Sequence, residues 1–357
     1  MERLTKISKI VFGLFAALSI GCSPGSDFSL NSEQNSFQQS VTKTQVKVDI
    51  LWVVDNSGSM ATSQDNVAAN FQSFIDKFQQ TNFDFQMAVT ATDAWRAPAN
   101  IANDPSLARF RDGTAATSFT GITVIKPDTP DIANVFQTNI KQGTNGSGDE
   151  RGWQSLREAL SMQENLDEPF PRQDALLAVI ILTDEDDFSH DGTNNVQGIP
   201  DPYNNPDLHD PMMYYDFLYN LTGSSEGNLN FMVNTIGIFD QACLDSLNTT
   251  WTGRKIALRY EGVTDLTGGY KGSLCDDFSD VMAGITDTII EKSTAFKLSR
   301  EPSIETIQVT IDGQVIPEDP VNGWTYDPAN LLIKLHGSAI PGAESVVSIT
   351  YDPAGLK

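Results

Sequence analysis

The sequence predicts an α/β fold with a mostly parallel sheet and helices on both faces, followed by a small antiparallel β domain. Almost continuously apolar runs, such as Val46 to Val54 and Ala175 to Thr183, indicate strands buried on both faces. Segments with the apolar spacing of amphipathic helices alternate with these strands, which implies right-handed crossovers and a Rossmann-like parallel sheet. After about Phe296 the helical spacing gives way to short alternating runs and turn residues, which predicts a separate β domain.

The composition supports a packed core and excludes one class of partner. The chain has 357 residues, of which 39% are hydrophobic and 20% charged, so most of it can bury a core. Its 23 Lys and Arg against 47 Asp and Glu give a formal net charge of −24. Because a nucleic-acid partner requires clustered basic residues that neutralise phosphates, we expect no nucleic acid among the partners.

Residues 1–21 have the features of an export signal. Arg3, Lys6 and Lys9 precede a mostly apolar run from Ile10 to Ile20. This run is shorter than the ~20 residues that a membrane-spanning helix needs. We therefore predict a signal peptide over residues 1–21.

The apolar run ends in Leu18–Cys22, which resembles the lipobox of bacterial lipoproteins. That resemblance implies that Cys22 is acylated and anchors the mature protein to a membrane of the bacterial envelope, at the outer membrane or the cell surface. The alternative is an ordinary cleaved signal peptide with an incidental cysteine. Residues 22–44 are rich in Ser, Asn and Gln and have little to bury, so we predict a flexible tether there.

The elements of the α/β domain, predicted over residues 45–294, follow from their apolar spacing. Strands are predicted at 46–54, 85–92, 175–183 and 230–239. Helices are predicted around 67–78, 132–140, 153–162, 212–221, 256–266 and 277–292. In the first helix, a single apolar stripe is formed by Val67, Phe71, Phe74, Ile75 and Phe78.

The β domain is predicted over residues 295–357 as a small sandwich-like unit. Its strands are expected at 306–311, 331–335 and 346–351. The dipeptides Asp312-Gly313 and Asn322-Gly323 are turn signals between alternating runs. These features favour antiparallel pairing.

Apart from Cys22, the sequence contains two cysteines, Cys243 and Cys275. In the oxidising compartment expected for an exported protein, we predict that they form a disulfide. Closing a loop of about 33 residues stabilises a fold by roughly 3 to 4 kcal/mol in the chain-entropy model. The alternative is a pair of buried free thiols.

The candidate metal ligands follow two of the most apolar strands. Asp55 and Asp184 come directly after these strands, and open α/β sheets collect ligands beyond the carboxyl ends of their strands. Ser57 and Ser59 follow Asp55 at a spacing of two, which points both hydroxyls to its side. Such an oxygen-only set favours Mg²⁺, Mn²⁺ or Ca²⁺ over zinc. Alternatively, these residues only form a turn and cap the next helix.

The run Asp55-x-Ser57-x-Ser59 after an apolar strand, with Asp184 after a later one, resembles a von Willebrand factor type A (VWA) domain and its metal-ion-dependent adhesion site. The resemblance covers about residues 46–292. It implies that Ser57 and Ser59 bind a divalent cation directly, with Asp55 and Asp184 helping directly or through water. It also implies an open coordination position that takes an Asp or Glu carboxylate of a partner protein.

The third loop of such a site normally supplies a Thr shortly before a Gly and a helix. Here the corresponding stretch is 143–152, in which the candidates are Ser147, Asp149 and Glu150. Glu150 as a ligand adds negative charge and can itself occupy the open coordination position. The alternative is that Glu150 pairs with Arg151 or with a helix N-terminus.

Two further acids follow in the run after Asp184. Asp186 and Asp187 are expected either in a solvated acidic loop or as ligands of a second cation, such as Ca²⁺, shared with Asp191 and Asn194.

These features predict a membrane-anchored, cation-dependent protein-binding module of adhesion type, and not an enzyme. No nucleophile and base pair is evident, and the histidines lack a zinc-enzyme spacing: His190, His209 and His336. One alternative is a structural envelope protein with a metal-stabilised loop. The other is a Mg²⁺-dependent phosphohydrolase of the haloacid dehalogenase type, which requires an Asp where this sequence has Ser57.

Overall fold

A computed structural model describes residues 47–80, 83–192, 203, 205–342 and 345–354. The predicted signal peptide (1–21), the lipidation site Cys22, the predicted tether (22–44) and Asn194 lie outside the described residues. Within the described ranges, no helix combines the length and the apolar character needed to cross a membrane.

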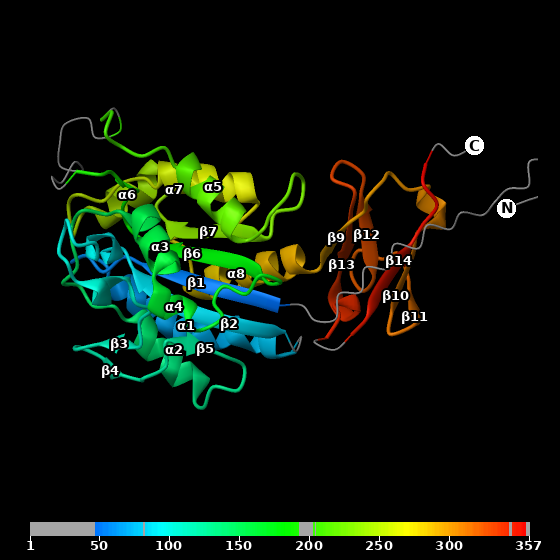
Figure 1. Ribbon diagram of the computed structural model, residues 1–357, viewed down its shortest axis with the longest axis horizontal. Coiled ribbons are helices and arrows are strands. Elements are labelled where there is room, and N and C mark those ends of the chain that lie inside the picture. The colour runs from blue at the N-terminus through cyan, green and yellow to red at the C-terminus, as the bar shows by residue number, and fades with distance from the viewer. Residues whose placement is uncertain (1–46, 81–82, 193–202, 204, 343–344, 355–357) are drawn as a thin grey trace, which may run out of the picture. The chain divides into compact units, whose positions relative to one another are not determined.

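Six strands form the central sheet (Figure 1): β1 Lys47–Val54, β2 Asp84–Ala91, β5 Val124–Ile125, β6 Leu176–Leu182, β7 Phe231–Gly237 and β8 Lys271–Ser273. Their order is β5-β2-β1-β6-β7-β8. All neighbouring pairs are parallel except β5 and β2. The predicted mostly parallel sheet is therefore confirmed, with β5 and β8 as short edge strands that the apolar pattern does not predict.

The strand order reverses between β1 and β6. The chain passes from β1 to β2 on one side and later enters β6 on the other side of β1. In the register, Val54 of β1 lies opposite both Ala91 of β2 and Leu182 of β6, so the three strands end at the same level. The carboxyl ends of strands at such a reversal are the usual ligand-binding place of α/β sheets.

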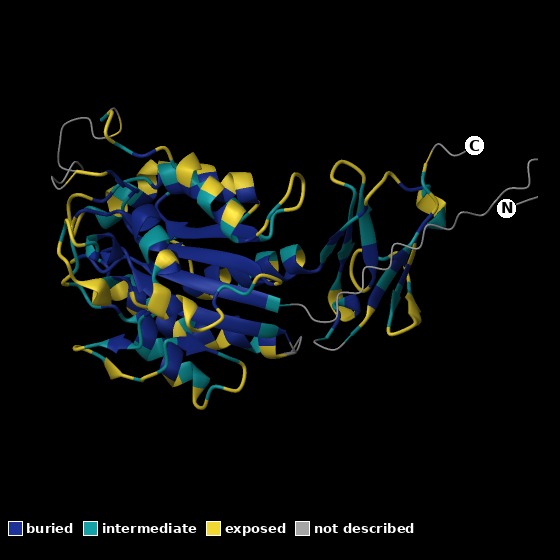
Figure 2. Ribbon diagram, viewed as in Figure 1, coloured by how far each residue is buried: buried dark blue, intermediate teal, exposed yellow. Residues whose placement is uncertain are grey.

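Helices cover both faces of this sheet, as predicted. One face packs against α1 Ala61–Gln80, α2 Ile132–Ile140 and α8 Phe278–Ser293, and the other against α3 Gly152–Ser161, α5 Met212–Leu221 and α7 Leu258–Thr267. Successive strand side chains point to opposite faces, so Trp52 joins the first core and Val53 the second. Figure 2 shows the strands buried, and exposed residues on the outer surfaces of the helices.

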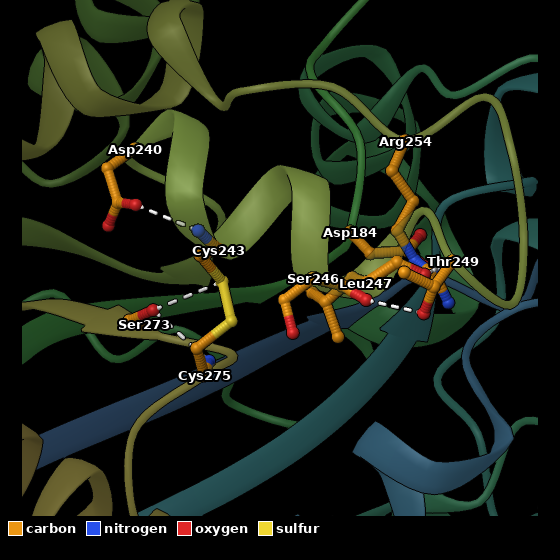
Figure 3. Close-up of a disulfide and its surroundings, with 9 residues drawn as sticks. All are labelled: Asp184, Asp240, Cys243, Ser246, Leu247, Thr249, Arg254, Ser273 and Cys275. Atoms are coloured by element: carbon orange, nitrogen blue, oxygen red, sulfur yellow. Dashed lines mark hydrogen bonds and ion pairs between the residues drawn. A yellow bond between two sulfur atoms is a disulfide. The ribbon is translucent and has the colours of Figure 1, made fainter.

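Several short elements complete this part of the chain: β3 Gly113–Thr114, β4 Ser118–Phe119, α4 Gln163–Leu166, α6 Gln241–Leu247 and the 3-10 helices Ala94–Arg96 and Pro105–Ala108. α6 begins where the Asp240 carboxylate accepts a hydrogen bond from the backbone N–H of Cys243 at 2.9 Å. The predicted disulfide is present and joins Cys243 of α6 to Cys275 after β8, with 5.8 Å between the two Cα atoms (Figure 3).

The C-terminal part forms two antiparallel sheets of three strands each. Their orders are β12-β13-β9 and β11-β10-β14. The bounds are β9 Ala295–Lys297, β10 Gln308–Ile311, β11 Gln314–Ile316, β12 Trp324–Asp327, β13 Leu332–Leu335 and β14 Val347–Thr350, with 3-10 helices at Ile304–Thr306 and Gly337–Ala339. Both sheets contribute to one core that includes Val309 and Ile333. At the β10–β11 turn, Asp312 and Gly313 have φ of 51° and 78°, as a tight hairpin requires.

Candidate metal centre

Of the predicted site residues, Asp55 and Asp184 lie just beyond the carboxyl ends of β1 and β6, which end at the same level as β2. Asp55 follows β1 directly, and its backbone N–H donates to the carbonyl oxygen of Leu182 at 2.9 Å. Thr92 follows β2, and its N–H donates to the carbonyl of Val54 at 3.0 Å. The sheet thus brings the loops after three strands to one edge.

The Asp55 carboxylate is fully buried and organises the loop that follows it. Its Oδ1 accepts a hydrogen bond from the N–H of Ser57 at 2.7 Å, and its Oδ2 accepts one from the hydroxyl of Thr183 at 2.9 Å. The hydroxyl oxygens of Ser57 and Ser59 lie 3.4 Å apart. Two oxygens that bind one hard cation at right angles lie roughly 3 to 3.7 Å apart. Residues 55–59 therefore form the turn given above as the alternative, and the distance between the Ser57 and Ser59 hydroxyl oxygens also fits two ligands of one cation.

Gln64, in the first turn of α1, connects this loop to the third loop. Its side-chain NH₂ donates to the carbonyl oxygens of Asp55 at 2.8 Å and Gly143 at 2.9 Å. Its Oε1 accepts from the N–H of Gly143 at 3.0 Å. The N–H of Gly146 donates to the carbonyl of Asn56 at 2.8 Å, and a side chain on Gly146 would overlap Asn56. Sequence reasoning misses Gln64, because a glutamine near a helix start gives no ligand signal.

Asp184 is buried and has one carboxylate oxygen in an ion pair and one without a partner. Its Oδ2 accepts from Nε of Arg254 at 2.6 Å, whereas Oδ1 has no hydrogen-bond partner in the described part of the chain. Figure 3 shows Arg254 reaching Asp184 from the segment that follows α6. Arg254 also donates to the carbonyl oxygen of Trp251 at 3.1 Å. Half of the Asp184 carboxylate is therefore free to bind a cation.

Glu150 is the third-loop candidate on which the carboxylates of Asp55 and Asp184 act electrostatically. It is 1% exposed, and neither of its carboxylate oxygens forms a hydrogen bond with a described residue. Burial first, and then the carboxylates of Asp55 and Glu185, raise the pKa of Glu150 well above its ordinary value. The Thr92 hydroxyl lowers this pKa in part, without the geometry of a regular hydrogen bond.

The alternative pairing of Glu150 with Arg151 is wrong. The buried Arg151 guanidinium instead donates to Oδ2 of Asp149 at 3.0 and 2.6 Å and stacks on Trp95, 3.7 Å from the ring centroid. Asp149 is therefore held in an ion pair. The half-buried Ser147 accepts a hydrogen bond from the N–H of Asp149 at 3.1 Å. Both residues stabilise the third loop itself.

Glu185 is a carboxylate of the site that sequence reasoning misses. Burial, followed by repulsion from Asp55 and Asp184, raises the pKa of Glu185 to about 9. Burial and Asp184 raise the pKa of Asp55 to about 7. We name Asp55, Glu150, Asp184 and Glu185 the acidic cluster. The signal for Glu185 is its place in the acidic run directly after Asp184.

Asp186 and Asp187 do not form a solvated loop, because both are fully buried. Asp186 accepts hydrogen bonds from the N–H of Arg259, in the first turn of α7, at 3.0 and 3.1 Å. Asp187 accepts one from the N–H of Trp153, at the start of α3, at 3.0 Å. Carboxylates at helix N-termini are stabilised by the helix dipole. Asp186 and Asp187 therefore hold the N-termini of α7 and α3 next to the candidate site through hydrogen bonds.

The chemistry of the unpartnered atoms fits a hard cation. Within the described ranges, no three His, Cys, Asp or Glu side chains form a metal-binding group, and the hydroxyls of Ser57 and Ser59 are the further oxygen donors at this edge of the sheet. In the described part of the chain, the buried oxygens without a hydrogen-bond partner near these strand ends include Asp184 Oδ1, Glu185 Oε2, both oxygens of Glu150, Asn56 Oδ1 and Thr92 Oγ1. Buried acceptors normally have a partner, and oxygen-rich surroundings with several carboxylates suit Mg²⁺, Mn²⁺ or Ca²⁺.

Comparisons with known proteins give distant structural similarity. No protein-family model and no curated protein matches the chain. The pilus adhesin SpaC from Lactobacillus rhamnosus GG, in its open conformation, is similar at 14% identity and a TM-score of 0.42, over 88% of this chain and 40% of that one. Proximal thread matrix protein 1 of the mussel byssus is similar at 12% identity and a TM-score of 0.39, over 72% of this chain and 51% of that one. The pilus adhesin RrgA from Streptococcus pneumoniae is similar at 12% identity and a TM-score of 0.31, over 88% of this chain and 57% of that one.

The chain thus spans only part of these similar proteins, from 40% to 57% of their lengths. At these TM-scores the similarity carries no argument about activity or partner. The assignment of a function therefore rests on the residues of this chain.

Proposed function

We propose that this chain is an adhesion-type binding module of the bacterial envelope, with a VWA-like metal-ion-dependent adhesion site that binds an acidic side chain of a partner protein. The observation that supports the proposal best is the acidic cluster at the strand-order reversal, in which charge repulsion contributes to the raised pKa values of Asp55, Glu150 and Glu185. In the described part of the chain, oxygens of Glu150, Asp184 and Glu185 also have no hydrogen-bond partner. Buried charges of one sign require protons or a counter-cation.

In this proposal the cation is Mg²⁺, or alternatively Mn²⁺ or Ca²⁺, held by Ser57, Ser59 and Asp184. A bound divalent cation supplies the positive charge that attracts a carboxylate of the partner. Asp55 keeps the loop in shape through the Ser57 N–H and the Thr183 hydroxyl. Gln64 holds the third loop against it.

Glu150 supports a second candidate function. If its two unpartnered oxygens bind the cation, the ion carries more negative charge around it and the open position is filled. The metal then stabilises the loops of a structural envelope protein and recruits no partner. The proposed anchorage through a lipid on Cys22 is the same in both cases.

The test begins with calorimetric titration of Mg²⁺, Mn²⁺ and Ca²⁺ into the full chain. We expect binding that Ser57→Ala and Asp184→Asn weaken about 10- to 100-fold, the range seen when metal sites lose a supporting group. Matched controls are Ser73→Ala on α1 and Asp216→Asn on α5, whose side chains are exposed. A folded wild-type protein that binds none of the three cations would refute the proposal.

Capture experiments then separate the two candidates. Envelope and host-cell proteins are passed over the immobilised full chain with Mg²⁺ or with EDTA. A partner retained only with Mg²⁺, and lost on Ser57→Ala, supports adhesion. Metal-dependent thermal stabilisation without a retained partner favours the structural role, and Mg²⁺-dependent hydrolysis of p-nitrophenyl phosphate favours the phosphohydrolase.

A further inference from the structure

Trp251 is a large aromatic side chain that is 54% exposed beside the candidate metal ligands. A Cβ atom added to Gly58 would lie 3.5 Å from Cη2 and 3.6 Å from Cζ3 of the Trp251 ring. Gly58 stands between Ser57 and Ser59 and is itself exposed. The ring edge therefore lies against the loop that bears both candidate hydroxyl ligands.

The backbone of Trp251 is fastened to the site. Its carbonyl oxygen accepts a hydrogen bond from Nη1 of Arg254 at 3.1 Å, and Nε of the same guanidinium donates to Asp184 at 2.6 Å. On the other side of this segment, α6 is tied to Cys275 through the disulfide of Cys243 (Figure 3). An exposed ring on a restrained backbone loses little conformational freedom when it is covered by a partner.

Tryptophan is usually well buried, and exposed aromatic residues beside a ligand site are frequent anchors of protein interfaces. The absence of a side chain on Gly58 leaves the ring edge in contact with bare backbone, so the rest of the ring can be covered from outside. A ligand bound at Ser57 and Ser59 would therefore have this ring beside it.

We propose that Trp251 is a specificity-determining residue that packs against an aromatic or prolyl side chain directly next to the acidic residue of the partner. This inference rests on the proposed function and names the partner chemistry that the same site selects. The neutral hydroxyl ligands favour a charged carboxylate over the hydroxyls of a sugar.

The charges near the ring favour an uncharged neighbour over a basic one. Arg254 lies against the Trp251 carbonyl, and Lys255 follows and acts electrostatically on Glu185. Because Arg254 is itself paired with Asp184, the positive charge that a Lys or Arg of the partner would meet beside the ring is that of Lys255. An uncharged ring avoids that repulsion and retains the aromatic contact.

The test measures the binding of blocked peptides to the full chain in the presence of Mn²⁺, by the paramagnetic relaxation of peptide protons in NMR titrations. The probes have the sequences Gly-Gly-Asp-Trp-Gly-Gly, Gly-Gly-Asp-Ala-Gly-Gly and Gly-Gly-Asn-Trp-Gly-Gly. We expect the Asp-Trp peptide to bind about 3- to 10-fold more tightly than the Asp-Ala peptide, as aromatic pair contacts allow. The Asn-Trp peptide should not bind.

The variant Trp251→Ala should abolish this preference and leave the affinity for Mn²⁺ unchanged, whereas Trp251→Phe should retain most of the preference. Phe119→Ala is the matched control, because Phe119 is an exposed aromatic residue on β4, outside the candidate site. Thermal melting confirms that each variant is folded.

Each of the other outcomes contradicts a defined part of the proposal: the role of Trp251, the class of partner or the metal site itself. Equal affinities of the Asp-Trp and Asp-Ala peptides for a Mn²⁺-binding wild-type protein refute the role of Trp251 and leave the proposed function standing. Trp251-dependent binding of a simple methyl glycoside, without binding of the acidic peptides, replaces the protein partner by a carbohydrate. A chain that binds no Mn²⁺ refutes the proposed function and this inference together.

Discussion

Glu150 and Arg151 are neighbours in the chain, but their side chains do not form an ion pair. The buried Glu150 carboxylate in the candidate site therefore has no hydrogen-bond partner among the described residues. The sequence alone favours their pairing about as much as metal ligation, because adjacent opposite charges are a common local arrangement. The structure separates them because Asp149 and Trp95 both engage the Arg151 guanidinium. Such a choice depends on three-dimensional packing and cannot be read from spacing. In contrast, Asp55, Ser57, Ser59 and Asp184 follow strand ends that the apolar pattern identifies.

The acidic cluster predicts an unusual pH dependence of stability in the metal-free protein. Because burial raises the pKa of Asp55 to about 7 and that of Glu185 to about 9, the folded chain retains protons that the unfolded chain releases at about pH 4. The contribution of these two groups to the free energy of unfolding in EDTA should therefore be highest below about pH 4 to 5 and fall towards pH 9. Thermal melts at about pH 5, 7 and 9 measure this slope.

Mg²⁺ should flatten that slope, because the cation replaces the retained protons. Glu150→Gln should also make it shallower, since one buried charge is removed, whereas the exposed Glu226→Gln should not. Stability in EDTA that rises between about pH 5 and 9 contradicts the electrostatic description of the cluster.

Arg254 is the cation that the chain itself supplies to Asp184, at 2.6 Å. Arg254→Gln leaves a buried carboxylate without its counter-charge, which typically costs about 3 to 5 kcal/mol. We expect that loss in urea unfolding with EDTA, and a partial recovery with Mg²⁺. Arg157→Gln is the control, because Arg157 pairs with Glu158 at 3.5 Å in a partly exposed position and should contribute less than about 1 kcal/mol. Similar losses in both variants would argue against a buried ion pair at Asp184.

At the scale of secondary-structure elements, the length of a strand or helix decides whether its position can be predicted from the sequence. The long strands β1, β2, β6 and β7 and the apolar stripes of α1 and α8 are predicted from periodicity alone. The two-residue strands β3, β4 and β5 are not, because two residues have no period. The seven-residue α6 is also missed, although Asp240 caps it. This omission matters because α6 leads into the segment that carries Trp251 and Arg254.

Gln64 allows a prediction at this scale, because it links α1 to two loops. Gln64→Ala removes hydrogen bonds to the carbonyl of Asp55 and to both backbone groups of Gly143. Leaving such groups unpaired costs about 1 to 3 kcal/mol. We expect that loss in urea unfolding and a weaker affinity for Mg²⁺ in calorimetry. Gln72→Ala, on the exposed side of α1, should change neither quantity. An unchanged Mg²⁺ affinity in Gln64→Ala would show that the third loop does not shape the site.

For the whole molecule, the net charge of −24 affects how fast an acidic partner associates. Like charges repel at long range, and salt screens this repulsion beyond about 8 to 10 Å. With Mn²⁺ in excess, the association rate of the Asp-Trp peptide should rise about threefold between roughly 20 and 150 mM salt. Surface plasmon resonance measures this rate. Asp76→Lys combined with Asp216→Lys, at a half-buried and an exposed position on outer helices, should raise the rate at low salt. A rate that falls with salt contradicts repulsion as the controlling effect.

Because β1, β2 and β6 end side by side at the same edge of the sheet, the length of each strand is constrained. Because successive residues of a strand alternate between the two faces, deleting or inserting one residue within β1 would reverse the residues on one side of the change relative to the other, and so misplace either Asp55 or the core residues before it. Insertions in surface loops carry no such penalty. The number of residues between Lys47 and Asp55 is therefore fixed by the architecture, whereas exposed loops away from the candidate site, such as the one between α5 and β7, can lengthen or shorten.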